Sequence, residues 1–313
     1  MNTQSSLFKE VSIESIRDIF DCALLENVIW EARLLDGGLF NTTYMVEYGS
    51  AHKKAVLRLG PINRHLLMGF EENLMEAEIY VYSVCRKIDV PCSNVLAYDT
   101  SKQMIDRDFM IVEYIPSVAM VNTELTEEQQ NHLDFQIGKQ LAKLHQVTGD
   151  SFGFVSRIRA GKYFKKWSDA IIFEIEDISE RLEKSGGIRG KKVNALREVF
   201  YQSRNLLDEI KEPHLLHTDL WAGNVLLNKD TMEIAAIIDG DRAVFGDVDF
   251  EFACSWMNNP AIKDGYGIHL QEFLHPNRVK RRQLYQMFFC LLEAYSYVII
   301  YRVRHIIIKK QKF

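Results

Sequence analysis

Residues 215–241 contain the feature that most constrains how this chain can fold. The stretch 215–227 reads Leu-Leu-His-Thr-Asp-Leu-Trp-Ala-Gly-Asn-Val-Leu-Leu, and the stretch 237–241 reads Ile-Ile-Asp-Gly-Asp. Short apolar runs bounded by polar and turn-forming residues are typical of buried strands. The sequence therefore predicts apolar strands that flank a polar loop, with Asp239 at the end of the next apolar strand.

The polar residues of this segment suit phosphoryl transfer. That reaction needs an oriented hydroxyl and metal ions that neutralise the charge developing on the phosphoryl oxygens. Asp219 can accept the hydroxyl proton, and Asn224 and Asp239 offer oxygen ligands for Mg²⁺. A plain turn between hairpin strands would use the same residue types, but the acid at position 239 favours the catalytic interpretation. We expect His217 to support the loop and leave the base role to Asp219.

The pattern His-x-Asp-x-x-x-x-Asn followed by Ile-Asp-x-Asp resembles the aminoglycoside phosphotransferase and choline kinase superfamily. Trp221 makes the loop similar to that of the fructosamine kinase branch. The resemblance implies a protein-kinase-like fold, ATP or GTP as the donor, and a small hydroxylated acceptor such as an aminoglycoside, a ketosamine or an amino alcohol. It also implies that Asp241 supports the metal site. The sequence departs from the family pattern at Thr218, where glycine is usual, and we expect the loop to tolerate this change.

A glycine-rich stretch lies upstream, where residues 35–44 read Leu-Asp-Gly-Gly-Leu-Phe-Asn-Thr-Thr-Tyr. Glycines allow backbone N–H groups to approach phosphates closely. A Gly-Gly pair alone usually marks only a turn, but the family's loop reads much like Gly-Gly-x-x-Asn. The resemblance therefore implies nucleotide contacts at Gly37, Gly38, Asn41 and Thr42.

Arg58 lies in the run Ala-Val-Leu-Arg-Leu, in a position where kinases usually have lysine. Arginine is permanently charged and can donate to two phosphate oxygens, so it can replace lysine as a phosphate clamp. A solvated arginine on an edge strand is the alternative. We expect the ion-pair partner to be Glu78, which shares a helix face with apolar residues, and Glu76 is a close second.

Two further segments complete the expected site. Residues 112–116 resemble the hinge between kinase lobes, and the backbone groups of Glu113 and Ile115 would then hydrogen-bond adenine. Residues 246–253 resemble the family's Gly-Asp-Pro-x-x-Asp-Leu-Ala segment, with Val248 in place of proline and Glu251 in place of aspartate. We interpret this segment as structural support beneath the metal site.

The order of predicted elements gives an α+β, bilobal, protein-kinase-like fold. Strands at 43–48, 55–59 and 108–114 and one helix at 74–88 predict an N-terminal antiparallel sheet with a helix. After Pro116 the pattern becomes helical, with a capping box at Thr126 and amphipathic segments at 167–184 and 193–210. We therefore expect a nucleotide-binding lobe over residues 1–114 and a catalytic and substrate-binding lobe over residues 115–313.

Composition narrows the partners and the compartment. The net charge of -5 and the pI near 6.0 make nucleic acid an unexpected partner. Five scattered cysteines predict neither a disulfide framework nor a zinc site and fit a cytoplasmic protein. The N-terminus lacks the apolar run of a signal peptide. The apolar run 287–301 is short and contains Glu293, so we expect a buried helix there and no membrane segment.

Three questions stay open at this level. A nucleotide-binding pseudokinase is the alternative to an active enzyme, although no metal or base residue is missing. The acceptor is undetermined: six acids in residues 167–184 could attract a polycationic aminoglycoside, yet such acids usually form a solvated helix face. The oligomeric state is also undetermined. A protein kinase is a poor fit, because Thr218 stands where the His-Arg-Asp motif has arginine.

Overall fold

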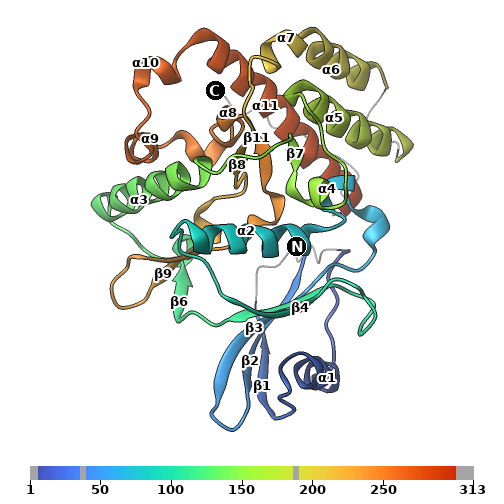
Figure 1. Ribbon diagram of the computed structural model, residues 1–313, viewed down its shortest axis with the longest axis vertical. Helices are drawn as coiled ribbons and strands as arrows, with labels where there is room; N and C mark the ends of the chain where they lie inside the picture. The colour runs from blue at the N-terminus through green and yellow to red at the C-terminus, as the bar shows by residue number, and fades with distance from the viewer. Residues whose placement is uncertain (1–5, 36–39, 186–189, 301–313) are drawn as a thin grey trace.

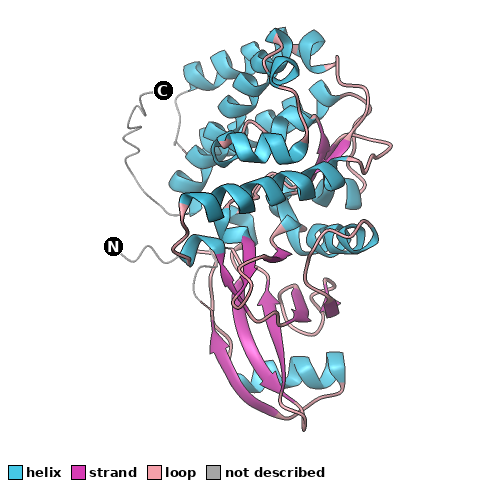
Figure 2. Cartoon of the chain, turned by 90° about the vertical axis from the view of Figure 1, so that its left-hand side faces the viewer, coloured by secondary structure: helices cyan, strands magenta, loops and turns pink. Residues whose placement is uncertain are grey.

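The computed structural model describes residues 6–35, 40–185 and 190–300. The chain forms a strand-rich N-terminal lobe and a helix-rich C-terminal lobe, which confirms the predicted α+β bilobal fold (Figures 1 and 2). The first lobe contains an antiparallel five-stranded sheet in the order β1-β2-β3-β5-β4. Its strands are β1 (Ile29–Leu34), β2 (Thr42–Tyr48), β3 (Lys53–Leu59), β4 (Val95–Asp99) and β5 (Phe109–Glu113).

Helices cover this sheet on both faces. Helix α1 (Ile13–Leu24) packs Ile16, Ile19 and Phe20 against buried side chains of β2, β3 and β5. Helix α2 (Leu74–Lys87) packs Met75 and Tyr82 against alternate residues of β5. Side chains alternate across a strand, so the two helices bury opposite faces. The helix predicted at 74–88 is confirmed, whereas α1 was not anticipated.

The C-terminal lobe is built mainly from helices. Helix α3 begins after Thr126, whose side chain accepts from the Gln129 N–H, so the predicted capping box is confirmed. Helix α5 matches the predicted segment 167–184, but segment 193–210 is divided between α6 and α7. The helices are α3 (Glu127–His145), α4 (Val155–Arg159), α5 (Trp167–Lys184), α6 (Gly190–Gln202), α7 (Arg204–Leu207), α8 (Val248–Glu251), α9 (Pro260–Tyr266), α10 (Leu270–Phe273) and α11 (Pro276–Tyr295).

Two small three-stranded sheets flank the polar loop of segment 215–227. One has the order β10-β9-β6 and the other the order β7-β11-β8. The segment 215–227 therefore spans two sheets, because β8 precedes the polar loop and β9 follows it. The strands are β6 (Ser117–Ala119), β7 (Gly153–Phe154), β8 (His214–Leu216), β9 (Val225–Asn228), β10 (Ile234–Ile237) and β11 (Val244–Gly246).

The segment between β3 and α2 is fastened to the C-terminal lobe. Phe70 stacks on Phe154 with ring centroids 4.1 Å apart, and Ser156 donates to the Phe70 carbonyl. The Gly69 N–H donates to Asp177 on α5 (3.0 Å), and the Tyr295 hydroxyl donates to the Leu66 carbonyl (2.9 Å). Helix α2 also packs against α4 and against the turn Gly240–Arg242. This helix therefore contacts both lobes.

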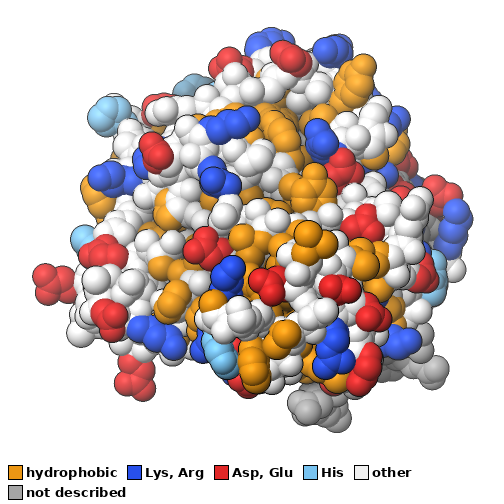
Figure 3. Space-filling model, turned by 60° about the horizontal axis from the view of Figure 1, so that its bottom comes forward, with side chains coloured by type: hydrophobic (Ala, Val, Ile, Leu, Met, Phe, Trp, Pro, Cys, Tyr) orange, Lys and Arg blue, Asp and Glu red, His pale blue; other side chains and the backbone are white. Residues whose placement is uncertain are grey.

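Residues 287–295 of the apolar run lie in helix α11, which packs Tyr285, Phe288 and Leu292 into the core of the C-terminal lobe, and residues 296–300 continue as a short π-helical segment. Within the part of the chain that the structure describes, no helix has the length and apolar character needed to cross a membrane. Charges of both signs are interspersed over the face seen in Figure 3. The described residues on that face therefore show no field of a single sign.

Candidate active site

The loop between β8 and β9 gathers the expected catalytic residues through hydrogen bonds of its own. The Asn224 amide donates to the Asp219 carbonyl (2.7 Å) and to its Oδ2 (3.2 Å). His217 is buried, accepts from the Asp219 N–H at Nδ1 (3.3 Å) and lies 3.1 Å from the Ile238 carbonyl at Nε2. Both imidazole nitrogens are thus engaged with the backbone, which suits loop support.

Thr218 has a backbone φ of 64°, in the left-handed region. This conformation is strained for a β-branched residue and explains why glycine would suit the position. Several bonds hold the residue there: its hydroxyl donates to the Arg242 carbonyl (2.8 Å), and its N–H donates to the buried Glu251 carboxylate (3.0 Å). The same carboxylate accepts from the His217 N–H (2.7 Å). Glu251 therefore anchors the start of the catalytic loop.

A second loop, after β10, brings Asp239 to the same place. The Ile238 N–H donates to the Asn224 carbonyl (3.0 Å), which joins the two loops directly. Asp239 also has a positive φ of 60°. The next residue is Gly240, and a side chain is excluded there because α2 lies against it: a Cβ at this position would come within 2.7 Å of Val81 Cγ1. The two loops and α2 are therefore closely packed around the site.

Arg58 lies between two carboxylates. Its guanidinium contacts Glu78 on α2 and Asp239 on the second loop. The sequence predicts Glu78 as the ion-pair partner of Arg58, with Glu76 as the alternative. The structure pairs Arg58 with Glu78, whereas Glu76 pairs with Arg159 (3.2 Å). The Arg58 side chain is only 10% exposed, so it is not a solvated surface arginine.

Burial and like charges perturb the acids of the site. Burial raises the pKa of the Asp219 carboxyl, an effect that the nearby Arg242 opposes. Burial and the neighbouring Asp239 and Glu78 raise the pKa of Asp241 well above its ordinary value. Burial also raises the pKa of Glu78, although Arg58 opposes this shift. Three carboxylates, those of Glu78, Asp239 and Asp241, therefore lie around the single guanidinium of Arg58.

The donor atoms of the site fit Mg²⁺. Carboxylate oxygens of Glu78, Asp239 and Asp241 lie within 4.8 Å of one another. Glu78 Oε2 is buried and has no hydrogen-bond partner among the residues that the structure describes. A hard divalent cation prefers oxygen ligands of this type and would relieve the excess negative charge. Asn224 adds an amide oxygen nearby.

The expected nucleotide-binding residues differ in their surroundings. Gly37 and Gly38 lie outside the described residues, and Asn41 is half-buried. Thr42 is fully buried, and its hydroxyl donates to the Lys9 carbonyl (3.0 Å) and accepts from Arg107 (2.8 Å). Its side chain is therefore committed to the base of the loop, so any contribution to nucleotide binding would pass through the loop's conformation.

The expected hinge follows β5. The Glu113 N–H donates to the Asn94 carbonyl (2.8 Å), and the Ile115 carbonyl accepts from the Ser117 hydroxyl (2.9 Å). Glu113 is exposed and Ile115 is half-buried. The two residues join the sheet of the N-terminal lobe to β6, which pairs with β9 in the catalytic region.

The segment 246–253 lies beneath the loops and contains a dense ionic cluster. Asp249 is fully buried and accepts from three arginines on α11, namely Arg278, Arg281 and Arg282. Asp247 accepts from Arg281 and from the Tyr285 hydroxyl (2.7 Å). This cluster joins α8 to α11 and so supports Glu251, which lies on α8.

Sequence reasoning missed two contacts of the site. The buried Glu71 pairs with Arg242 (2.6 Å), and the Arg242 guanidinium lies 5.0 Å from the centre of the Phe40 ring. Tyr82 donates its hydroxyl to Glu78 Oε1 (2.7 Å). The helical spacing of Tyr82 and Glu78, four residues apart, could have revealed the second contact. Nothing local in the sequence indicates the first.

The acids of α5 do not form an open acidic surface. Each of the six pairs with an arginine or lysine, which satisfies its charge within the protein. The pairs are Asp169–Arg204, Glu174–Arg157, Glu176–Arg197, Asp177–Arg181, Glu180–Lys184 and Glu183–Arg197. This arrangement favours the solvated helix face over a polycation site.

The fold and the arrangement of the two loops define a kinase-like phosphotransferase. A model of the phosphotransferase enzyme family (APH) matches residues 31–283, and the chain belongs to this family. It is therefore a small-molecule phosphotransferase, with ATP as the donor that the family implies.

Similar proteins agree with this family. A probable ketoamine kinase of Vibrio parahaemolyticus is 27% identical over 297 residues, covering 88% of this chain and 90% of the relative. A probable ketoamine kinase of Escherichia coli is 25% identical over 260 residues, covering 79% and 80%.

Solved structures share the fold. A candidate fructosamine-3-kinase from Thermobifida fusca has a TM-score of 0.65 at 17% identity and covers 93% of this chain and 96% of its own. A Plasmodium vivax ethanolamine kinase has a TM-score of 0.59 at 15% identity, covering 85% and 77%. At these identities the likeness supports the fold alone.

Proposed function

We propose that this enzyme transfers the γ-phosphoryl group of Mg-ATP to a hydroxyl of a ketoamine. One observation carries the catalytic part: Asp219, Asn224 and Asp239 converge from two loops beside the Arg58–Glu78 pair. This set holds a base, metal ligands and a phosphate clamp, which are the parts that phosphoryl transfer requires.

Each residue has a separate role in the proposed reaction. Asp219 orients the acceptor hydroxyl and takes its proton, and the Asn224 side-chain amide fixes the Asp219 carboxylate by donating a hydrogen bond to its Oδ2 (3.2 Å). Asn224 and Asp239 would hold Mg²⁺, which supplies neutralising charge to the phosphates. Arg58, held by Glu78, donates to the phosphates. The Glu113 N–H is already bonded within the protein, so Ile115 is the better placed of the two to donate to adenine.

The ketoamine acceptor rests on the relatives and on Trp221. The Vibrio and Escherichia relatives are described as probable ketoamine kinases. The Trp221 side chain is 41% exposed two residues after Asp219, and its ring lies against Gly223, where a Cβ would come within 2.2 Å of Cζ2. A fixed, exposed indole suits stacking on the apolar face of a sugar. The paired acids of α5 disfavour an aminoglycoside.

The base assignment is tested by Asp219→Ala. Turnover with a fructosamine and ATP should fall by on the order of a hundredfold or more, because the base and the orientation of the hydroxyl are lost. ATP binding, measured by calorimetry, should stay nearly unchanged because the phosphate clamp remains. Turnover equal to that of the parent would exclude Asp219 as the base.

The metal assignment is tested by Asp239→Asn. The affinity for Mg-ATP should fall, because a charged ligand becomes neutral.

An acceptor panel of fructosamines, aminoglycosides and amino alcohols, followed by ATP turnover, tests the substrate class. Turnover with amino alcohols but not with fructosamines would refute the ketoamine proposal and leave the kinase chemistry intact.

A further inference from the structure

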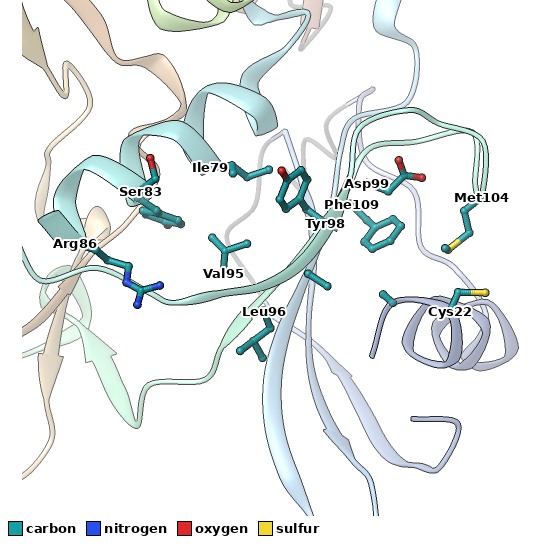
Figure 4. A pocket seen from close by; sticks show the side chains of 13 residues that line it. Cys22, Ile79, Ser83, Arg86, Val95, Leu96, Tyr98, Asp99, Met104 and Phe109 are labelled. Atoms are coloured by element: carbon teal, nitrogen blue, oxygen red, sulfur yellow. The ribbon is translucent and has the colours of Figure 1, made fainter. Parts of the chain in front are cut away.

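A cavity of about 510 Å³ lies in the N-terminal lobe, away from the catalytic loop. Figure 4 shows it between α2, the β4 region and α1. Its volume falls within the range of about 300–1,000 Å³ that small-molecule sites occupy. Asp219, Asn224 and Asp239 are not among its lining residues. This cavity is therefore separate from the proposed catalytic site.

The cavity has a mostly apolar and aromatic lining, with the Arg86 guanidinium at one end and the Asp99 carboxylate, which accepts from the Ser101 N–H (2.8 Å), at the other (Figure 4). Tyr98 is 56% exposed there, and Phe109 and Ile79 add further apolar surface. Arg86, on the exposed side of α2, donates to the Asn94 side chain (2.5 Å). Among the described residues no carboxylate lies within ion-pair distance of Arg86. The lining thus combines ring-binding surface with a positive charge that an anionic ligand could pair with.

The wall formed by α2 connects the cavity to the proposed nucleotide clamp. The Tyr82 side chain lines the cavity, and its hydroxyl donates to Glu78 Oε1 (2.7 Å). Glu78 in turn holds Arg58. A ligand in the cavity would therefore lie one residue away from the carboxylate that positions Arg58.

We propose that this cavity binds a small aromatic anion and that its occupation strengthens ATP binding through Tyr82 and Glu78. The coupling rests on the role proposed above for Arg58, whereas the binding does not. The cavity is open in the arrangement in which Glu78 holds Arg58. A ligand that fills it stabilises that arrangement, which is also the one that ATP requires. Linkage then demands that ATP strengthen binding of the aromatic anion by the same factor.

Binding is tested with 8-anilinonaphthalene-1-sulfonate, an aromatic sulfonate whose fluorescence rises in apolar sites. The full chain should bind one equivalent saturably, and Ser83→Trp should abolish binding by filling the mouth of the cavity from the exposed side of α2. Arg86→Ala should weaken binding by about tenfold, since a charge-assisted contact is lost. Lys87→Ala, which removes a neighbouring exposed cation outside the lining, should change nothing.

Coupling is tested by titrating ATP calorimetrically with and without the sulfonate. ATP should bind about fivefold more tightly in its presence, the lower end of common coupling strengths. Tyr82→Phe keeps the ring but loses the hydroxyl, so it should bind the sulfonate as before and show no coupling.

The proposal is overturned if the sulfonate fails to saturate, binds equally well to Ser83→Trp, or is displaced by ATP. Coupling that persists in Tyr82→Phe would overturn the route through Glu78. A failure of the proposed kinase chemistry has a different signature, because Arg58→Ala would then bind ATP like the parent while the sulfonate titrations stayed unchanged.

Discussion

Two buried ionic clusters of this enzyme have opposite charge balance. Around Arg58, the carboxylates of Glu78, Asp239 and Asp241 surround one guanidinium. Beneath the loops, Asp247 and Asp249 face three guanidinium groups of α11, contributed by Arg278, Arg281 and Arg282. The first cluster has three carboxylates for one guanidinium, whereas the second has three guanidinium groups for two buried carboxylates.

The difference separates a functional cluster from a supporting one. Burying unpaired charge is unfavourable, so a cluster that serves only stability is expected to be neutralised within the protein. The Asp247–Asp249 cluster meets this expectation, because each of its carboxylates is paired with a guanidinium and two of the arginines also pair with Glu272 and Glu209. The Arg58 cluster does not, and Glu78 Oε2 within it is buried without a partner in the described part of the chain. We infer that the excess charge is reserved for a metal ion.

The largest expected effect comes from breaking the balanced cluster. Asp249→Ala would leave three guanidinium groups without their shared carboxylate, so the free energy of unfolding should fall by about 3–5 kcal/mol. Denaturant unfolding measures this change. Asp264→Ala, at an exposed position on α9, is the matched control and should have little effect. A loss below about 1 kcal/mol for Asp249→Ala would mean that the cluster is not a main support.

Substitutions of Arg58 should have the second-largest effect, on the KM for Mg-ATP. Arg58→Ala should raise the KM for Mg-ATP by on the order of tenfold or more, because the charged donor to the phosphates is lost. Arg58→Lys should retain part of the activity, since the charge remains while the two-pronged donor geometry is lost. Lys54→Ala, at an exposed position of the same strand, serves as the control. Three similar KM values for the Arg58 series would exclude this residue as the clamp.

Neutralising one acid of the Arg58 cluster should raise the free energy of unfolding, whereas Asp249→Ala should lower it. Asp241→Asn should increase the free energy of unfolding by about 1 kcal/mol when divalent cations are chelated, because buried like-charge repulsion falls. The gain should shrink when Mg²⁺ is added. Asp230→Asn, an exposed acid, should show neither effect. If the chelated Asp241→Asn protein were less stable than the parent, the two clusters would not differ as we describe.

Thr218 should give the smallest effect. Thr218→Gly relieves the left-handed strain but loses the hydroxyl bond to Arg242, two terms of about 1 kcal/mol each that nearly cancel. Thr218→Ala loses the bond and keeps the strain, so it should be less stable by about 1 kcal/mol. Thermal unfolding of both variants measures this difference in stability. Equal stability of the two would show that the left-handed backbone of residue 218 is not strained.

Much of the site was predictable because its main residues are close in sequence. Asp219, Asn224 and Asp239 lie within 21 positions, on loops bounded by clear apolar strands. The preference for Glu78 over Glu76 followed from helical spacing alone, and the structure pairs Glu78 with Arg58. Periodicity of the side chains was sufficient in these cases.

Long-range pairings could not be predicted in the same way. Glu71 and Arg242 are 171 positions apart, and neither has a local signal that indicates the other. The acids of α5 could not be distinguished from an open acidic surface until their arginine partners on other helices were placed. Tertiary packing decides such contacts, and a single sequence does not reveal it.

The attachment of the segment before α2 has a mechanical consequence. Phe70 and Gly69 tie the entrance of α2 to the C-terminal lobe, whereas Arg58 lies in the central part of the opposing sheet. If the sheet moves relative to the C-terminal lobe to release product, the start of α2 is held by that lobe while Met75 and Tyr82 remain packed on β5. A change in the angle between the lobes would then change the Arg58–Glu78 separation, so a pair of spectroscopic labels on β3 and α2 would report how far the enzyme has opened during each turnover.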